Sequence, residues 1–395
     1  MRGRTDDGRY VGVCDGIRVL SIGIVAWFHI WQQSWLWPSL PIPGTGRVLD
    51  LDFLVRSGYM WVDLMILLSG FCHALPWARL APSDPDPAPG TFYRKRLARI
   101  VPSTYLSVLL FFALAFKSGL YADVGAALRD LLTHLSFTHV FSYETYYATP
   151  INAALWTISI EMHFYLLFPL IARAFRRRPF LTSGGMIAVA LGFRAWIGAH
   201  VPVVDLYFNQ LVAYLDTFAL GMLAALVHVR LEAYGDRRII RALGSVVALL
   251  ALYGLLQLAR GQSALGDVDA IRRGQMDRRL AMGLCGAGLL LGSAHGGPVI
   301  RRLLSNPLTR FLSGVSMQFY IWHQPFAVKL RESGLIFSPF DNPHYAGDAA
   351  WQQRFNLAVW LGALLLAAAL TYGFERPIAR LILGRDKKKR PPEGR

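Results

Sequence analysis

Ten stretches of mostly apolar residues follow one another along the chain, and each comes close to 20 residues in length. A helix of about 20 apolar residues crosses a hydrocarbon core of roughly 30 Å. Because lipid offers no hydrogen bonds to the backbone, such stretches are expected to be helical. The sequence therefore predicts an all-α, polytopic integral membrane protein with about ten transmembrane helices, at 17–36, 58–77, 100–118, 151–172, 180–199, 207–228, 241–259, 280–295, 310–328 and 355–375.

The composition agrees with a chain that lies mostly in a membrane. Of its 395 residues, 54% are hydrophobic and only 17% are charged, whereas soluble domains carry about 25% charged residues. The N-terminal segment is polar and the apolar stretch after it is long enough to span, so no cleavable signal peptide is expected. We predict a single transmembrane domain over 1–395, with its spans inside 17–375 and a basic cytosolic tail over 376–395.

The distribution of Lys and Arg predicts the orientation of the helices. The net charge is +16, and in a membrane protein such an excess belongs to cytoplasmic loops rather than to a nucleic-acid surface. With the N-terminus in the cytosol, the inner segments carry about twice as many Lys and Arg residues as the outer ones. This predicts an N-in/C-in, multi-pass protein of the bacterial inner (cell) membrane. The connection 260–279 does not follow this rule, because it carries five arginines and yet is expected on the outer side.

Two further features bear on the kind of site. Cys14, Cys72 and Cys285 are scattered without a ligand spacing, so neither a disulfide framework nor a zinc site is expected. The long outer connection 119–150 contains an amphipathic stretch followed by the aromatic run FSYETYYATP. Such a run is typical of an interfacial aromatic belt, and it would equally suit a platform for sugar rings.

The first predicted span carries two ionisable residues, Arg18 and His29, and such residues inside spans are costly and often functional. Eleven residues of helix make about three turns and rise ~16 Å, so both side chains share one face. Coenzyme A has phosphates at one end and a thioester at the other, and it could extend from Arg18 near the cytosol to His29 near mid-membrane. Two plainer interpretations stay open, a snorkelling anchor for Arg18 and a buried structural histidine for His29.

The segment before the third span adds two more cations. Arg96 and Arg99 are three residues apart and therefore lie on one helical face. Two forked guanidinium groups on one face suit a phosphate. Positive-inside topology alone would also explain them. Both lie on the side where coenzyme A is made.

The fourth span holds a carboxylate, Glu161, about eleven residues from its inner end. His29 lies at a similar distance from the inner end of its own span, so the two are expected at one depth. A carboxylate beside an imidazole would orient the ring as a general base requires. The sequence thus predicts a catalytic pair of His29 and Glu161, and a lone structural carboxylate is the plainer alternative.

The remaining candidates are Asp63 in the second span and the segment that ends the ninth span. Pro325 is expected to loosen that helix and to leave His323 near the outer face, in an acceptor-side or structural role. His29, His163 and His323 do not have the spacing of metal ligands, so no metal site is expected.

These segments together resemble the acyltransferase-3 family of integral-membrane acyltransferases, which includes bacterial O-antigen and exopolysaccharide O-acetyltransferases. The motifs that carry the resemblance follow the family's order over 15–377. They are Asp15-Gly16-Ile17-Arg18 with His29, Val62-Asp63 followed by Ser69-Gly70-Phe71, Arg96-x-x-Arg99 with Ile100-x-Pro102, Leu155-Trp156 with Ser159-x-Glu161 and Phe164-Tyr165, Tyr320-x-x-His323-x-Pro325, and Phe374-Glu375-Arg376-Pro377.

The resemblance implies a role for each matched residue. His29 is the implied catalytic residue, Ser159 and Glu161 are implied active-site residues, and Tyr320 joins Asp63 and His323 as a further candidate. Arg18, Arg96 and Arg99 are the implied donor-binding residues. The implied donor is an acyl-CoA, often acetyl-CoA, used as a co-substrate with no permanently bound cofactor. Family members can carry an extra periplasmic domain, so we expect any periplasmic or glycosyltransferase partner of this chain to be a separate protein.

We therefore expect a membrane-bound O-acyltransferase that moves an acyl group, with acetyl favoured, from cytosolic acyl-CoA to a hydroxyl of a cell-surface or lipid-linked carbohydrate. The alternative is a multi-span transporter or flippase of a glycan or lipid, since charged residues near the midplane suit that class too. The shared face of Arg18 and His29 and the Arg96/Arg99 pair favour the enzyme, because they predict thioester binding. Peptidoglycan and a small hydroxylated metabolite stay open as acceptors.

Overall fold

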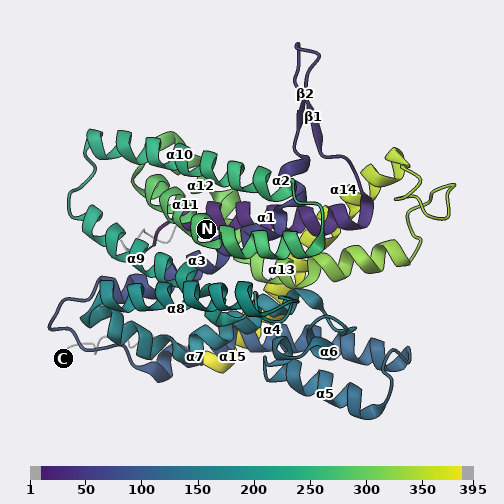
Figure 1. The fold of residues 1–395 in the computed structure, drawn as a ribbon, viewed down its shortest axis with the longest axis horizontal. Coiled ribbons are helices and arrows are strands. Elements are labelled where there is room, and N and C mark those ends of the chain that lie inside the picture. Colours follow the sequence, from purple (N-terminus) through teal and green to yellow (C-terminus); the bar gives the residue numbers. More distant parts are fainter. Residues whose placement is uncertain (1–9, 385–395) are drawn as a thin grey trace, which may run out of the picture.

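The computed structural model describes residues 10–384 and consists mainly of helices that run side by side (Figure 1). Within that range, ten α-helices have 17 or more residues, and each of the ten predicted stretches lies mostly in one of them or in a helical turn that adjoins it. This confirms the all-α fold class. The long helices are α1 (Val13–Ser34), α3 (Val62–Ala78), α4 (Pro89–Lys117), α7 (Trp156–Arg177), α8 (Pro179–His200), α9 (Leu215–Glu232), α10 (Arg238–Ser263), α11 (Val268–His295), α13 (Pro307–Glu332) and α14 (Ala349–Leu370).

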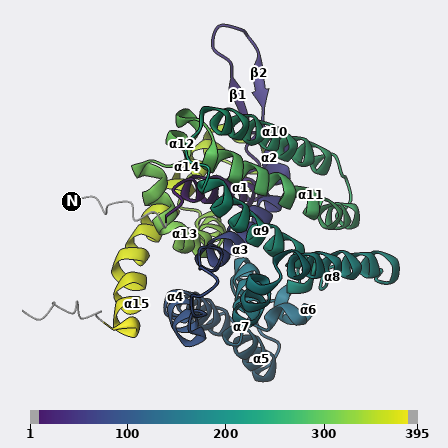
Figure 2. The ribbon, with the colours of Figure 1, turned by 90° about the vertical axis from the view of Figure 1, so that its left-hand side faces the viewer.

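Short elements connect the long helices. The sequence analysis did not anticipate the antiparallel pair of β1 and β2, which forms a hairpin that projects from the bundle (Figures 1 and 2). The short elements are β1 (Ser39–Pro41), β2 (Val48–Asp50), α2 (Asp52–Arg56), α5 (Val124–Leu135), α6 (Tyr143–Tyr146), α12 (Pro298–Leu304) and α15 (Arg376–Leu383), with 3-10 turns at Gly58–Trp61, His139–Phe141, Ala153–Leu155 and Leu211–Tyr214.

Fewer helices than the ten predicted are long and apolar enough to cross a membrane. Eight helices of the described chain are long and apolar enough to cross a membrane, and a ninth qualifies only if α11 and α12, which meet at 113°, count as one span. The two helices that fall short correspond to the predicted spans 280–295 and 310–328. Both contain charged residues that lower their hydropathy, among them Arg279 in α11 and Lys329 in α13.

The expected outer connection 260–279 is mostly helix. α10 continues to Ser263 and α11 begins at Val268, where Asp267 caps it by accepting a hydrogen bond from the N–H of Ala270. The arginines of this segment find partners inside the protein, since Arg279 donates to the carbonyl of Phe208 at 2.6 Å. Packing inside the protein therefore accounts for these arginines, and the side of the membrane on which this connection lies stays a prediction.

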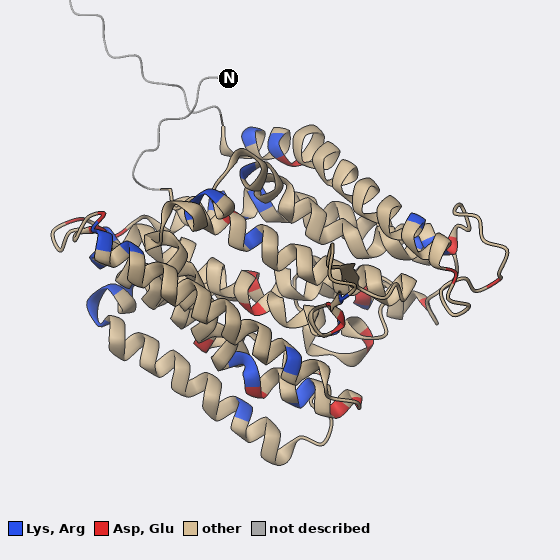
Figure 3. Ribbon diagram, turned by 90° about the horizontal axis from the view of Figure 1, so that it is seen from above, with Lys and Arg blue, Asp and Glu red and all other residues tan. Residues whose placement is uncertain are grey.

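Ion pairs join several of the basic connections at one end of the bundle. Arg79, after α3, donates to Glu232 at the end of α9 at 2.9 Å, and Arg176, near the end of α7, donates to Asp86 at 2.6 Å. Most of the charged residues drawn in Figure 3 lie toward the ends of the helices. Three of the segments predicted to be cytosolic, 79–99, 173–178 and 230–241, thus share an end, and which side of the membrane that end faces stays a prediction.

Close helix contacts position the site. α3 lies between α1 and α9, and α1 also packs along α13. A Cβ atom on Gly221 of α9 would come within 2.1 Å of the Leu67 carbonyl oxygen, and one on Gly70 of α3 would come within 2.4 Å of the Phe218 carbonyl oxygen. Small residues let helix backbones approach closely in membranes. These two glycines therefore set the spacing of α3 and α9.

The C-terminal helix is longer than the predicted last span. A π-helical turn at Thr371–Glu375 links α14 to α15, and Glu375 turns inward to accept a hydrogen bond from Gln318 at 3.0 Å. α15 thus begins inside the expected basic tail. Residues 385–395 of that tail lie outside the described residues.

Candidate active site

A cavity of about 330 Å³ lies among α1, α3, α4, α7 and α13, and we call it the arginine cavity. Five of the predicted site residues line it together, although they come from four different helices. Its charged and polar lining comprises Arg18, Ser69, Cys72, His73, Arg96, Arg99, Thr157, Glu161, Tyr165, Ser316 and Tyr320. The apolar lining comprises Ile22, Val62, Met65, Ile66, Ile100, Ile158 and Met317.

Three guanidinium groups face one carboxylate in this cavity. Arg18 donates to Ser313 Oγ of α13 at 3.1 Å. The guanidinium of Arg96 lies 6.0 Å from the ring centre of Phe92, and its buried Nε has no hydrogen-bond partner among the described residues. Arg99 follows one helical turn later. The excess of positive charge in a partly enclosed space attracts anionic ligands.

Glu161 is held by a short chain of hydroxyl groups. Tyr165 donates to the Glu161 carboxylate at 3.0 Å, and Ser69 Oγ lies 3.2 Å from the same tyrosine oxygen. Since the tyrosine hydroxyl hydrogen goes to Glu161, Ser69 donates to Tyr165. The chain fixes Glu161 on the cavity wall.

His29 is paired with His323 rather than with Glu161. Nδ1 of His29 lies 2.9 Å from Nε2 of His323, and Nδ1 of His323 lies 3.0 Å from the carbonyl oxygen of Phe319. A carbonyl accepts only, so Nδ1 of His323 carries the hydrogen and, in the neutral ring, Nε2 accepts. His29 must then donate through Nδ1, which leaves a lone pair on its Nε2.

The helix order explains why the predicted contact between His29 and Glu161 is absent. α1 packs against α13 and α3, whereas α7 packs against α3 and α8. Arg18 and His29 do share a face, because both contact α13, through Ser313 and His323 respectively. Equal depth in the membrane did not make His29 and Glu161 neighbours.

The expected loosening of the helix at Pro325 was wrong. α13 runs through Pro325 to Glu332, and His323 is fully buried in the bundle. Its position relative to the outer face of the membrane stays a prediction. Pro325 has no N–H for the carbonyl of Ile321, four residues earlier, and that carbonyl instead accepts from Asn152 Nδ2 at 2.7 Å. The replacement bond lets the helix continue.

Tyr320 lies one helical turn before His323. Its hydroxyl accepts a hydrogen bond from Thr157 Oγ1 at 2.8 Å, and both residues line the arginine cavity. Tyr320 therefore links the cavity to α13, the helix that also carries His323, the partner of His29. His29 itself does not line the cavity.

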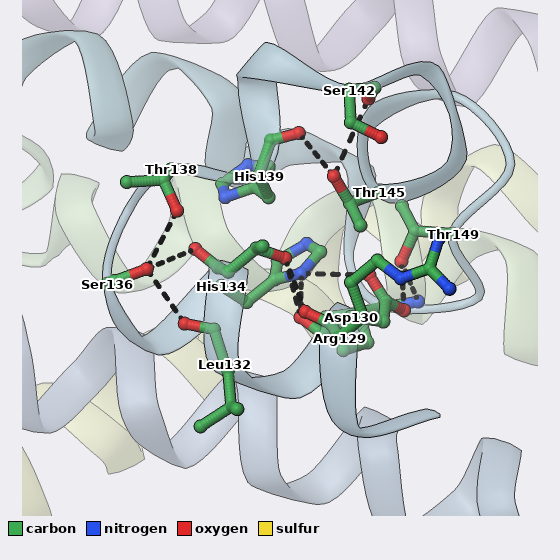
Figure 4. A network of polar contacts seen from close by, with 12 residues as sticks. Arg129, Asp130, Leu132, His134, Ser136, Thr138, His139, Ser142, Thr145 and Thr149 are labelled. Carbon is green, nitrogen blue, oxygen red and sulfur yellow. Dashed lines mark hydrogen bonds and ion pairs between the residues drawn. The ribbon is translucent and has the colours of Figure 1, made fainter. Parts of the chain in front are cut away.

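Ser159 faces away from the cavity, toward the outer connection. Its Oγ lies 3.4 Å from His139 Nδ1, and the rings of His139 and His134 stack with centres 4.0 Å apart. His134 pairs in turn with Asp130 at 3.1 Å, as part of the polar network in Figure 4. Burial, helped by the neighbouring His134, lowers the pKa of His139 well below its ordinary value, so the ring is neutral.

Asp63 also lies outside the cavity. Its carboxylate is 3.7 Å from Nε of Arg279, both side chains are fully buried, and neither carboxylate oxygen has a hydrogen-bond partner among the described residues. Arg279 also lies over the ring of Tyr214, 3.6 Å from its centre. Asp63 therefore ties α3 to α11.

Several polar residues of the cavity were not predicted from the sequence, among them Cys72 and His73. Cys72 and His73 follow Ser69 by three and four residues, which places all three on one helical face. That spacing was the available signal, but Cys72 was weighed only as a disulfide or zinc ligand. Between residues 10 and 384, no three His, Cys, Asp or Glu side chains are placed to hold a metal ion, and catalysis without a metal stays a prediction.

Comparison with known proteins agrees with the motif order. The sequence profile of a family described as an acyltransferase domain, the acyltransferase-3 family, matches residues 13–376. The chain belongs to the acyltransferase-3 family. Membership disfavours the alternative of a transporter or flippase. With eight or more helices able to span, the chain is a multi-pass membrane protein of an acyltransferase family. No solved structure matches it significantly.

Curated relatives are distant but extensive. Nodulation protein 10 of Rhizobium leguminosarum bv. viciae is 24% identical over 309 residues, which cover 72% of this chain and 76% of that protein. The O-acetyltransferase OatA of Staphylococcus aureus is 24% identical over 391 residues, or 94% of this chain and 58% of OatA. The peptidoglycan O-acetyltransferase OatA of Listeria monocytogenes is 22% identical over 341 residues, 80% of this chain and 49% of OatA. The chain thus spans about half the length of the two OatA proteins.

Proposed function

We propose that the protein is an O-acetyltransferase of the bacterial inner membrane that takes an acetyl group from cytosolic acetyl-CoA. The acceptor in this proposal is a hydroxyl of a cell-surface or lipid-linked carbohydrate. The observation that carries the proposal is the arginine cavity. Arg18, Arg96 and Arg99 line it together with Tyr320, which lies one helical turn before His323, the partner of His29. In this proposal the basic end of the bundle faces the cytosol and the chain is N-in/C-in.

The cavity suits the donor because its two ends differ. Phosphates of coenzyme A form charge-assisted hydrogen bonds with guanidinium groups, which are the strong kind. The pantetheine arm is long and thin, and Ile22, Val62 and Met65 provide an apolar passage for it beyond the arginines. The thioester then lies at the wall formed by Thr157 and Tyr320.

His29 supplies the reactive lone pair. Its Nδ1–H is engaged with His323, which fixes the tautomer and leaves Nε2 as a base. In direct transfer, Nε2 removes the proton from the acceptor hydroxyl as its oxygen attacks the thioester carbonyl. The carbon–sulfur bond breaks, and the departing thiolate takes up a proton.

A covalent route would use the same lone pair. Nε2 would attack the thioester carbonyl, form an acyl-imidazole and release coenzyme A as a thiolate. The acceptor oxygen would then attack the acyl carbon, the carbon–Nε2 bond would break and return the lone pair to the ring, and the hydroxyl proton would pass to solvent, where it balances the thiolate released in the first step. This route separates the donor step from the acceptor step in time, which suits substrates on opposite sides of a membrane.

The names of the relatives support an O-linked acceptor. Both OatA proteins are named O-acetyltransferases, and the one from Listeria monocytogenes is named for peptidoglycan. A hydroxyl on an envelope glycan is the shared chemistry of those names. Peptidoglycan is therefore the first acceptor to test.

The test uses inside-out membrane vesicles that contain the full chain and are supplied with radiolabelled acetyl-CoA. Labelled acetate should appear on an envelope glycan with wild-type protein and fall by about 10²–10⁴ with His29→Ala. His200→Ala is the matched control, because His200 is exposed at the end of α8. Wild-type turnover by His29→Ala would refute the mechanism. Label trapped on the protein without acceptor, and lost in His29→Ala, would identify the covalent route.

A further inference from the structure

A second cavity adjoins the arginine cavity at the basic end of the bundle. It encloses about 300 Å³ and is lined by aromatic and proline side chains, including Trp77, Phe92 and Phe168. We call it the aromatic cavity. Phe92 and Phe168 lie with ring centres 5.1 Å apart, and Trp77 meets the edge of Phe168 at 6.4 Å. These rings pack against one another and give the cavity an aromatic wall, and no step proposed so far uses it.

The two cavities adjoin, because they share part of their walls. Cys72, His73 and Arg96 line both of them. Lys95, next to Arg96, lines the aromatic cavity alone. Arg96 therefore lies between them, with the aromatic wall on one side and the cavity that reaches Tyr320 on the other.

His73 marks the junction as a place for a ligand. The side chain is only 9% exposed, and its Nε2 has no hydrogen-bond partner among the described residues. Its Nδ1 lies 2.5 Å from the Ser69 carbonyl oxygen, which can only accept, so Nδ1 carries the hydrogen and Nε2 is an acceptor. A buried acceptor without a donor is unfavourable unless a bound molecule supplies an N–H or O–H. Arg96 Nε is a buried donor that likewise has no hydrogen-bond partner among the described residues.

Coenzyme A has the matching order of parts. An adenine ring stacks on aromatic side chains, and such stacking contributes about 1–3 kcal/mol per base. The phosphates come next and need cations, and the pantetheine arm follows with N–H groups and an apolar body. The aromatic cavity, the junction and the arginine cavity provide these environments in the same sequence.

We propose that the aromatic cavity is the binding site for the adenine nucleotide half of the donor. The ring lies among Trp77, Phe92 and Phe168, the phosphates contact Lys95 and Arg96 at the junction, and His73 Nε2 accepts an N–H of the donor. This assignment rests on the proposed function and extends it. It explains why a full coenzyme, rather than any short thioester, is the donor.

Filling the aromatic cavity tests the assignment without touching the passage to His29. Ala88 lines the aromatic cavity, is exposed, and precedes α4 without making a side-chain cap, so Ala88→Trp adds a bulky ring there. Thr91→Trp fills the same cavity from the first turn of α4. Ser83→Trp is the matched control, because Ser83 is exposed on the same connection and lines neither cavity.

Binding is measured by calorimetry on the purified full chain in nanodiscs, with coenzyme A, pantetheine and adenosine bisphosphate as ligands. We expect adenosine bisphosphate to compete with coenzyme A on the wild type. Ala88→Trp should weaken coenzyme A binding at least tenfold, abolish that competition and leave pantetheine binding unchanged, while Ser83→Trp should match the wild type.

Three outcomes would overturn the assignment. They are wild-type affinity for coenzyme A in both filled variants, equal losses for coenzyme A and pantetheine in monodisperse filled variants, and no competition by adenosine bisphosphate on the wild type. A wild type that binds no coenzyme A at all would instead refute the proposed donor and hence the proposed function. The two failures are therefore distinguishable.

Discussion

Replacing His323 tests whether the histidine pair sets the reactivity of His29. His323→Phe keeps an aromatic ring at a fully buried position but removes the acceptor that lies 2.9 Å from His29 Nδ1. Leaving a buried donor unsatisfied costs about 1–3 kcal/mol. The ring of His29 would avoid that cost by moving its hydrogen to Nε2, which removes the proposed base.

If the whole cost falls on the transition state, kcat should fall about 5–150-fold, because each 1.36 kcal/mol is a factor of ten in rate. His323→Gln should lose much less, since its amide oxygen can accept from His29 while its NH₂ group donates to the carbonyl of Phe319. Coenzyme A affinity should be unchanged in both variants, because His323 does not line either cavity.

The assay is initial-rate acetyl transfer in vesicles at saturating acetyl-CoA, paired with calorimetric binding of coenzyme A. Wild-type kcat in His323→Phe would show that the pair does not prepare His29. Equal losses in the Phe and Gln variants would show that packing, rather than the accepted hydrogen bond, is what matters at this position.

Three further predictions concern other parts of the molecule. Arg96→Ala and Arg99→Ala should each weaken coenzyme A binding by roughly 1.5–3 kcal/mol and make the residual binding less sensitive to salt. Calorimetry checks this against Arg177→Ala, which removes an exposed arginine at the same end. Unchanged affinity in both variants would contradict the donor role. Asp63→Ala leaves the buried charge of Arg279 without its carboxylate and should lower the free energy of unfolding by about 3–5 kcal/mol. The unfolding temperature in detergent should fall, and the double variant Asp63→Leu/Arg279→Met should partly restore it. No change in Asp63→Ala would refute this tie between α3 and α11. The pKa of His139 is lowered in the fold by burial and by His134 and His163. The contribution of the neutral ring to the free energy of unfolding should therefore be complete above an unfolded pKa of about 6.5 and be lost progressively as the pH falls below that value. His139→Phe should flatten the acid side of the plot of unfolding temperature against pH, and an unchanged plot would contradict this.

Much of the fold follows from local sequence patterns. The ten apolar stretches lie mostly in helices because a backbone surrounded by lipid must form its hydrogen bonds internally. Arg18 and His29 face the same neighbour because eleven residues come close to three helical turns. The sequence also identified Arg18, Arg96, Arg99, Glu161 and Tyr320, which line one cavity. Their roles in the reaction stay proposals.

Only the tertiary structure decided which residues are partners. His29 and His323 are 294 positions apart, and their contact depends on α1 packing beside α13, which no local pattern encodes. Glu161 lies on α7, which packs against α3 and α8, and its hydrogen bond comes from Tyr165, one turn later on the same helix. The start of α11 was taken for a connection because it is charged, whereas its arginines have partners on distant segments, as Arg279 has in Asp63. Periodicity fixes the face of a helix, whereas packing among helices fixes what that face meets.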